Sequence, residues 1–251
     1  MSLCILTNDS ALFSFASSSS MQYLRSMTLN ANVQTVTAPL EADFERAYIQ
    51  VEREFSALLV LCPAPALLGG LEAAQAAAHA HGGVLKISVL DTGQIGAGLG
   101  ILAQIAARQA SAGASLAEVE DCVRAALPYI FTLFCPGRNP QENFSQTSEA
   151  ANQPMFSLED GALLPFKKVR TKRHLIEDLL EFLEEFEHPQ QLTFFHGSAS
   201  KLRSHSLRET AGRLFPGILL NDLNLNPPLT ALFGPQTVGM TVLEMPSRIE
   251  K

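Results

Sequence analysis

One stretch, residues 87–113, constrains the fold more than any other part of the chain. A β-branched apolar run ends in Asp91-Thr92, a turn with several glycines follows, and a segment with small and apolar residues on one helical face comes next. This order predicts a strand, a tight polar loop and the start of a helix. In an α/β sheet such a junction lies at the carboxyl end of a strand, where ligands bind, and the helix N-terminus offers unpaired N–H groups to an anion. We therefore expect a binding pocket to open at junctions of this kind.

The same alternation of strands and helices runs through the first half of the chain. At this spacing it predicts a parallel sheet with right-handed crossovers. Ser115, followed by Glu118 three residues later, predicts a capping box at a helix start. Between residues 11 and 40 the pattern is irregular, and only a strand near 25–29 is expected. The other expected elements are strands at 3–7, 57–62 and 85–90 and helices at 41–55, 71–81, 98–112 and 115–127.

The composition changes abruptly at residues 136–153, which are polar and rich in Asn, Gln and Ser. A long segment of this kind favours a loop or linker, so we expect an N-terminal α/β domain at 1–138 and a C-terminal α/β domain at 139–251. A strand at 129–135 falls in the first of these. The second domain is expected to contain a hairpin at 154–165 that turns at Asp160-Gly161, helices at 171–187 and 199–214, strands at 192–196, 218–220 and 229–233, and an edge strand at 240–245.

Composition and charge exclude several classes of function. The formal net charge of −7 argues against a nucleic-acid partner, and the basic run from Lys167 to His174 is the only strong local exception. No apolar run approaches the roughly 18 residues that span a bilayer, so we expect no stable membrane insertion. The four cysteines lack the spacing of a metal site. These features predict a cytoplasmic protein with free thiols and no metal.

Four segments together resemble the DegV family, the fatty-acid-binding proteins that serve as lipid-carrying subunits of bacterial fatty acid kinase. They are 5–11 (ILTNDSA), 87–120, 157–183 (SLEDGALLPFKKVRTKRHLIEDLLEFL) and 229–244. The resemblance implies a two-domain α/β fold, with a three-layer N-terminal domain around a parallel sheet, a two-layer C-terminal domain and a ligand cleft between them. It also implies that the chain is not itself an enzyme, that its ligand is a fatty acid and that it has no other cofactor.

The resemblance also implies where the ligand binds. The carboxylate head group is expected near Ser10, Thr37, Gly69-Gly70 and Thr92, with Gly234-Pro235 closing the opposite wall. Asp9 and Asp91 adjoin the two hydroxyl residues, and Arg170 matches an arginine that recurs in the family. The chain departs from the family pattern at three polar positions, where it has Val36, Leu68 and Leu232 instead of a threonine, a serine and a histidine.

The residues themselves leave two roles open for the polar side chains that follow the strands. Their hydroxyls could bind a carboxylate directly, or Asp and Ser could cap turns and hold loop N–H groups. We predict burial of a long-chain fatty acid or similar amphiphile that is presented to a partner kinase. The alternatives are a divergent member that has lost lipid binding and acts as an interaction protein, a protein that binds a different small anion, and an enzyme of similar architecture. The sequence lacks a phosphate loop and an activated histidine, which disfavours the enzyme.

Overall fold

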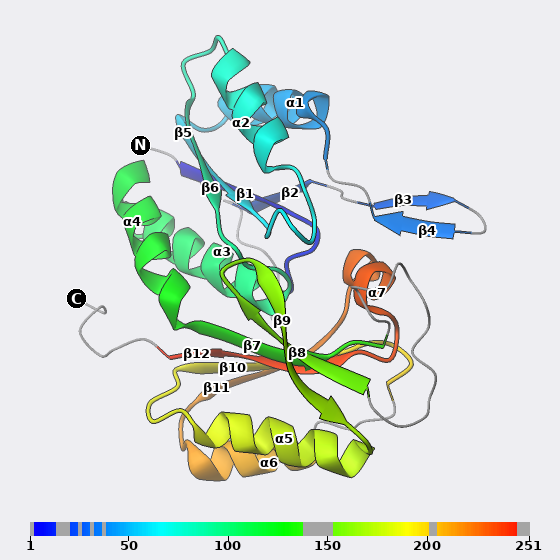
Figure 1. Ribbon diagram of the computed structural model, residues 1–251. Coiled ribbons are helices and arrows are strands. Elements are labelled where there is room, and N and C mark those ends of the chain that lie inside the picture. The colour runs from blue at the N-terminus through cyan, green and yellow to red at the C-terminus, as the bar shows by residue number, and fades with distance from the viewer. Residues whose placement is uncertain are drawn as a thin grey trace. The chain divides into compact units, whose positions relative to one another are not determined.

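The computed structural model describes residues 3–13, 21–24, 27–30, 33–36, 39–137, 153–200 and 205–244 (Figure 1). The chain divides into two compact units. The first comprises Met1–Pro128 together with Asp160–Ala162, and the second comprises Tyr129–Glu159 and Leu163–Lys251. Both combine helices with a sheet, so the predicted α/β class is confirmed.

The first unit is built on a four-stranded sheet in the order β2-β1-β5-β6. Every pair of neighbours is parallel, as the alternation of strands and helices predicts. The two central strands are buried at every residue, because helices cover both faces and leave no side for polar groups. The strands are β1 (Leu3–Asn8), β2 (Met21–Leu24), β5 (Ala57–Cys62) and β6 (Lys86–Asp91), and a separate two-stranded antiparallel sheet joins β3 (Met27–Asn30) to β4 (Val33–Val36).

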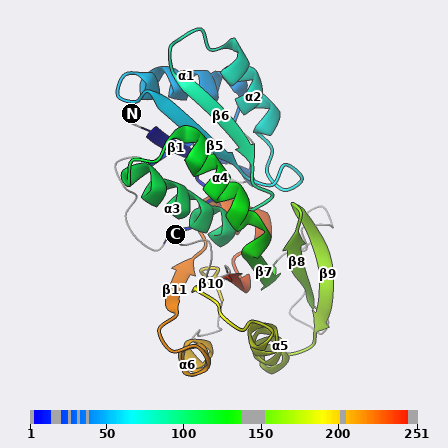
Figure 2. The same ribbon diagram turned by 90° about the vertical axis from the view of Figure 1, so that its left-hand side faces the viewer.

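Helices lie on both faces of this sheet and give the first unit three layers (Figure 2). On one face, Leu6, Leu58 and Val60 pack in one apolar cluster with Tyr48 of α1 and Ala74 of α2. On the other face, α3 contacts β1 and α4 contacts β5. The predicted capping box is confirmed at the start of α4. The helices are α1 (Glu41–Glu52), α2 (Leu71–Ala80), α3 (Ala97–Ser111) and α4 (Leu116–Ala126).

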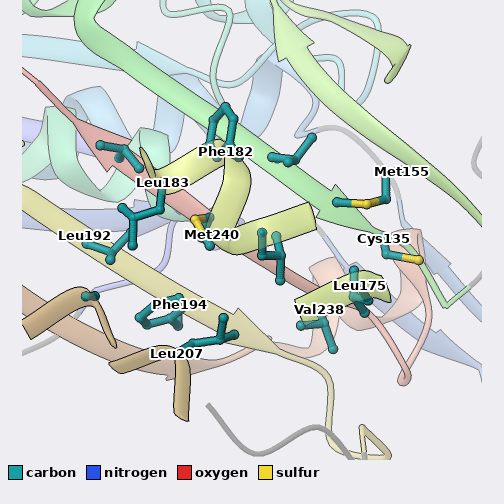
Figure 3. Packing of buried hydrophobic residues seen from close by; sticks show 14 of the residues in the cluster. Cys135, Met155, Leu175, Phe182, Leu183, Leu192, Phe194, Leu207, Val238 and Met240 are labelled. Carbon is teal, nitrogen blue, oxygen red and sulfur yellow. The ribbon is translucent and has the colours of Figure 1, made fainter. Parts of the chain in front are cut away.

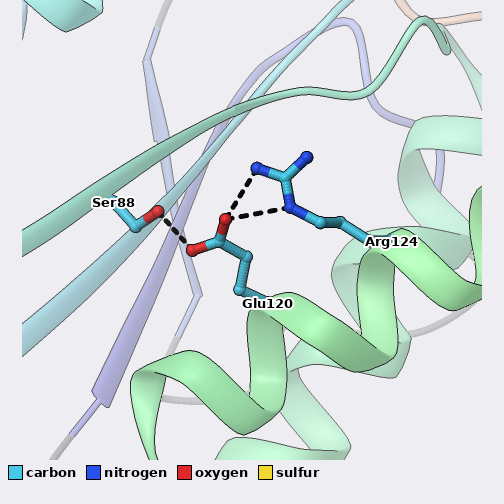
Figure 4. A network of polar contacts seen from close by, with 3 residues as sticks. All are labelled: Ser88, Glu120 and Arg124. Carbon is cyan, nitrogen blue, oxygen red and sulfur yellow. Dashed lines mark hydrogen bonds and ion pairs between the residues drawn. The ribbon is translucent and has the colours of Figure 1, made fainter.

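Two carboxylates tie helices of the first unit to neighbouring segments. Glu52, the last residue of α1, accepts hydrogen bonds from the backbone N–H groups of Val84 and Leu85 at 2.6 and 3.1 Å, which holds the turn that leads into β6. Glu120 of α4 accepts a hydrogen bond from the Ser88 hydroxyl at 2.6 Å and two from Arg124 (Figure 4). The hydrogen bond from Ser88 is the main cause of a lowered pKa at Glu120.

The second unit contains a six-stranded sheet in the order β11-β10-β12-β7-β8-β9. The predicted hairpin is confirmed, and both residues of its turn, Asp160 and Gly161, have positive φ angles of 47° and 78°. β10 and β11 are parallel, whereas β12 is antiparallel to both β10 and β7. The strands are β7 (Ile130–Cys135), β8 (Gln153–Glu159), β9 (Ala162–Val169), β10 (Gln191–His196), β11 (Leu219–Asn224) and β12 (Val238–Leu243).

Helices α5 (Lys172–Glu184) and α6 (His205–Leu214) cover one face of the second sheet (Figure 1). Figure 3 shows side chains of these helices, among them Leu175 and Phe182, in one cluster with strand residues such as Met240. On the opposite face, the ring of Phe134 lies 4.9 Å from that of Phe233 and 6.4 Å from that of Phe195, centroid to centroid. These rings share the sheet with buried polar residues such as Thr132 and Thr241, whose hydroxyl groups form a hydrogen bond at 2.8 Å.

Three sequence expectations are corrected in the second unit. Residues 229–233 do not form a strand but end helix α7 (Pro227–Phe233), because Asn226 caps its N-terminus and two prolines follow. Strand β12 is not an edge strand, since it lies between β10 and β7. Strand β7 pairs with β12 and β8 in the second sheet, although the predicted N-terminal domain, 1–138, included it.

Candidate functional site

The carboxyl ends of β1, β5 and β6 lie at one edge of the first sheet, as the parallel registers require. Six of the predicted site residues lie at this edge: Asp91 ends β6, and Asp9, Ser10, Gly69, Gly70 and Thr92 belong to the loops that follow the strands. A small pocket with room for about one water molecule opens beside two of these loops. The described residues that line it are Leu6, Thr7, Asn8, Pro39, Phe44, Val60, Leu61, Cys62, Pro63, Gly69 and Gly70.

The start of α2 forms one wall of the pocket. Gly70 is the N-cap and has a φ of 118°, a conformation that residues with a side chain rarely adopt. A Cβ atom there would lie 3.3 Å from Cδ of Pro39 and 3.8 Å from the ring of Phe44. The first helical hydrogen bond runs from the N–H of Ala74 to the Gly70 carbonyl, so the N–H groups before Ala74 have no acceptor within the helix. This end of α2 can therefore donate to an anion or a carbonyl oxygen.

The hydroxyl groups at the sheet edge already donate to oxygens of the protein. Thr92 Oγ1 donates to the Cys62 carbonyl at 2.7 Å, and Thr7 Oγ1 donates to the Leu61 carbonyl at 3.1 Å. Ser10 Oγ donates to Asn8 Oδ1 at 2.5 Å, and Ser10 is fully buried. A hydroxyl has one proton to donate. In this arrangement these side chains hold the loops together and have no proton left for a carboxylate.

Asp91 and the residues that follow it also hold a loop. Oδ1 of Asp91 accepts the N–H of Gly93 at 2.9 Å, and Thr92 Oγ1 accepts the N–H of Gln94 at 3.2 Å. The carbonyl of Gln94 accepts the N–H of Ala64 at 2.9 Å, which joins the loop after β6 to the loop after β5. The capping role that the sequence left open is thus the one seen for Asp91.

The loop after β1 lies directly on the start of α3. The N–H of Gly96 donates to the Ser10 carbonyl at 3.1 Å, and the N–H of Leu12 donates to the Gly96 carbonyl at 2.9 Å. A Cβ atom at Gly100 would lie 1.8 Å from the Leu12 carbonyl oxygen. Glycine at position 100 therefore permits this close approach, which fixes the loop that carries Asp9 and Ser10.

Asn8 is one of the pocket residues that sequence reasoning missed. It is 4% exposed, and its Oδ1 accepts the N–H and the hydroxyl of Ser10. Because a backbone N–H can only donate, these contacts identify Oδ1 as the oxygen and fix the orientation of the amide. The amide nitrogen, Nδ2, is buried and has no hydrogen-bond partner among the residues that the structure describes. The signal in the sequence is a polar residue that ends an otherwise apolar strand.

The remaining predicted site residues do not belong to this sheet edge. Arg170 follows β9 in the second unit and is exposed. Gly234 ends α7, where its carbonyl accepts the Thr237 hydroxyl at 2.8 Å, and the Pro235 carbonyl accepts the N–H of Ala199. Thr37 lies outside the described residues. In the basic run, Lys167 pairs with Asp178 and Glu181, and Arg173 pairs with Glu177.

The described lining of the pocket carries no side chain that is charged at neutral pH. Cys62 is its one cysteine, and burial raises the pKa of this thiol to about 12, so it stays protonated. Among the described residues, no group of three or more His, Cys, Asp or Glu side chains could hold a metal ion. Within the same residues, no helix has both the length and the apolar character needed to cross a membrane.

Comparisons with known proteins agree with this architecture. The model of a family described as uncharacterised protein, DegV family, matches residues 1–139. A DegV family protein from Corynebacterium glutamicum is 20% identical, with a TM-score of 0.84 over 98% of this chain and 99% of that one. A DegV lipid-binding protein from Thermotoga maritima is 18% identical, with a TM-score of 0.83 over 97% and 98%.

Similar solved structures also include proteins with a bound fatty acid. The fatty acid kinase B3 protein from Streptococcus pneumoniae, loaded with linoleic acid, is 14% identical, with a TM-score of 0.81 over 97% of this chain and 99% of that one. At these identities the likeness establishes the fold. No curated protein matches the chain.

Proposed function

Because the chain belongs to the DegV family, we propose that it binds a long-chain fatty acid or a similar amphiphile and does not transform it. The observation that carries this proposal is the pocket at the carboxyl ends of β1 and β5. Its walls are largely apolar, with Phe44, Val60 and Pro39 among them, and the N-terminus of α2 supplies backbone donors. Such a combination suits a ligand with an apolar chain and an oxygen-bearing head group.

The energetics of an acyl chain fit this kind of site. Each methylene removed from water contributes about 0.8 kcal/mol, so a chain of about 14–16 carbons binds tightly with few polar contacts. The pocket has room for about one water molecule, far less than the roughly 300–1,000 Å³ of a typical ligand site. We therefore propose it only as the place of the head group, and its walls must move apart when the ligand binds. The cleft between the two predicted domains, which would take the rest, stays a prediction.

Presentation of the head group to a separate kinase subunit is the second part of the proposal. It is supported by the structural likeness to the linoleic-acid-loaded fatty acid kinase protein. Arg170 is exposed on the second unit and stays a candidate for contact with an acidic partner or a carboxylate. A cytoplasmic location also stays a proposal, and it is supported by the buried free thiols of Cys4, Cys62 and Cys135.

Native mass spectrometry of the purified protein, followed by lipid removal and addition of a 16-carbon fatty acid, tests the binding. We expect a co-purified acyl mass and stoichiometric refilling. A protein that stays free of ligand in both measurements would contradict the proposal. The replaced polar positions at Val36, Leu68 and Leu232 favour one rival, a divergent interaction protein without lipid binding. Retention of a small anion in place of a lipid would support the other rival.

Two matched variants locate the site. Phe44→Ala removes an aromatic ring that lines the pocket, whereas Phe182→Ala removes a similarly buried ring from the core of the second unit. Each should cost about 3–5 kcal/mol of stability. We expect only Phe44→Ala to weaken fatty-acid binding, by about tenfold, because about 1.4 kcal/mol of apolar contact is lost. Equal affinities in the two variants would remove the pocket from the binding site.

A further inference from the structure

We propose that the tip of the β8–β9 hairpin, Asp160–Ala162, is a lid that must lift before a ligand can enter the site at the carboxyl edge of the first sheet. The hairpin tip belongs to the first unit, although the strands on either side of it belong to the second. This inference rests on the proposed function, since it concerns how the ligand reaches the same site. It adds a segment that sets the rate of ligand exchange.

The hairpin tip lies on the loops that follow β5 and β6. A Cβ atom built on Gly161 would lie 3.4 Å from Cα of Gly93 and 3.8 Å from Cβ of Ala64. From the opposite side, a Cβ atom at Gly93 would lie 3.2 Å from the backbone nitrogen of Gly161. Gly161 is buried in this contact. Two glycine backbones therefore meet with no side chain between them.

The hairpin tip is held on these loops by packing alone. Among the described residues, no hydrogen bond or ion pair joins Asp160, Gly161 or Ala162 to either loop. The two loops, in contrast, are joined to each other, because the N–H of Ala64 donates to the Gln94 carbonyl at 2.9 Å. The tip can therefore leave without breaking a hydrogen bond to the loops beneath it, as a segment that opens and closes requires.

The pocket beside these loops needs such a movement. It has room for about one water molecule, so it is closed to the head group of a fatty acid. Pro63, Gly69 and Gly70, all in the loop after β5, form one of its walls. Ala64, on which the hairpin tip lies, directly follows Pro63. While Gly161 is in place, it obstructs the outward movement of this loop, and lifting the tip frees the wall to move.

A disulfide that holds the hairpin tip closed tests the lid. The 3.8 Å between Cβ of Ala64 and the Cβ position of Gly161 matches the mean Cβ–Cβ separation in disulfides, about 3.8 Å. The test protein is the full chain with Ala64→Cys and Gly161→Cys, and with Cys122→Ser to remove a partly exposed thiol. Stopped-flow fluorescence measures the uptake of a fluorescent 18-carbon fatty acid by the lipid-free protein. We expect uptake to be slower by about tenfold or more in the oxidised form than in the reduced form.

Two controls accompany this measurement. The single variant Gly161→Cys should take up the fatty acid at the same rate with and without reductant, because it cannot form the disulfide. Gly161→Ala is compared with Gly113→Ala, since both glycines have a positive φ but a Cβ atom at Gly113 meets nothing within 4 Å. We expect uptake to be about threefold faster in Gly161→Ala alone, because the altered turn packs less firmly on Gly93.

The outcomes separate the lid from the proposed function. If the unmodified protein takes up no fatty acid, the proposed function fails and the lid fails with it. If the unmodified protein binds, and the oxidised and reduced forms of the double variant take up the fatty acid equally fast, only the lid is overturned. Should the disulfide not form, or the reduced double variant not bind, the comparison of Gly161→Ala with Gly113→Ala decides, and equal rates in these two variants overturn the lid.

Discussion

The close approach of the loop after β1 to helix α3 can be tested by one methyl group. In Gly100→Ala the new Cβ would lie 1.8 Å from the Leu12 carbonyl oxygen and 2.8 Å from its carbonyl carbon. Both atoms are backbone, so the loop itself must move. Movement breaks the two hydrogen bonds that join the loop to Gly96, worth about 1 kcal/mol each. Overpacking adds about 1–3 kcal/mol, which gives a loss of about 3–5 kcal/mol in the free energy of unfolding.

Thermal and urea unfolding, followed by circular dichroism, measure this loss. Since about 1 kcal/mol lowers Tm by about 2–4 °C in a chain of this size, the Tm of Gly100→Ala should fall by about 6 °C or more. Gly212→Ala is the control, because a Cβ there meets only Leu220 Cδ1 at 3.9 Å within α6. It should be neutral or stabilising by up to about 1 kcal/mol. A Gly100→Ala variant within about 1 kcal/mol of the unmodified protein would refute the packing of this loop on α3.

Three further predictions concern the first unit. Glu52→Ala removes the acceptor of two backbone N–H groups and should lower the free energy of urea unfolding by about 2 kcal/mol. Ser88→Ala removes the main cause of the lowered pKa of Glu120. It should therefore cost about 1 kcal/mol at pH 7, above the unfolded-state pKa of Glu near 4.3, and less as the pH falls through the lowered folded-state pKa. Urea unfolding at pH 7 and pH 3 would measure this decrease. Cys62, with a pKa of about 12, should react with iodoacetamide at pH 8 about a thousandfold more slowly than in the unfolded chain, and more slowly still when fatty acid is bound. The more exposed Cys122 is the control, and its rate of reaction should not change with the ligand. Peptide mass analysis follows both cysteines in one experiment.

Elements with a local cause could be predicted from the sequence. β5 coincides with the continuous apolar run 57–62, and the capping box of Ser115 and Glu118 forms as expected. The Asp160-Gly161 turn also forms, because its positive φ angles suit these two residues. In each case a few neighbouring residues determine the local structure, so secondary-structure propensity and turn preferences are sufficient to predict it.

Elements whose identity depends on long-range pairing could not be predicted in the same way. The run 229–233 is apolar and short, and such a run does not distinguish a strand from a helix. The overlooked signal is Asn226 followed by Pro227 and Pro228, which favours a helix start. The central place of β12 depends on pairing with β7, whose partner residues lie about a hundred positions away in the chain. Nothing in the local pattern of β12 specifies that neighbour.

The candidate site could likewise be predicted only in part from the sequence. The sequence located the sheet edge, because strand ends in a parallel sheet share one side. It could not assign the proton of Thr92, which goes to the carbonyl of Cys62 on the neighbouring strand. Nor could it identify Asn8, since an asparagine at the end of a strand also suits an ordinary turn. Hydrogen-bond roles depend on distances between strands, which the order of residues does not give.

One hydrogen bond both occupies the hydroxyl proton of Ser10 and fixes the orientation of the Asn8 amide. Ser10 is fully buried, so its hydroxyl must have an acceptor inside the protein, and Oδ1 of Asn8 provides it. That same contact turns the other end of the amide, a donor, away from Ser10. A ligand that displaced Ser10 would leave a buried hydroxyl unpaired. The network around Ser10 therefore withdraws the serine hydroxyl from ligand binding, and under the proposed function the apolar walls around Phe44 make the acyl chain the main source of affinity.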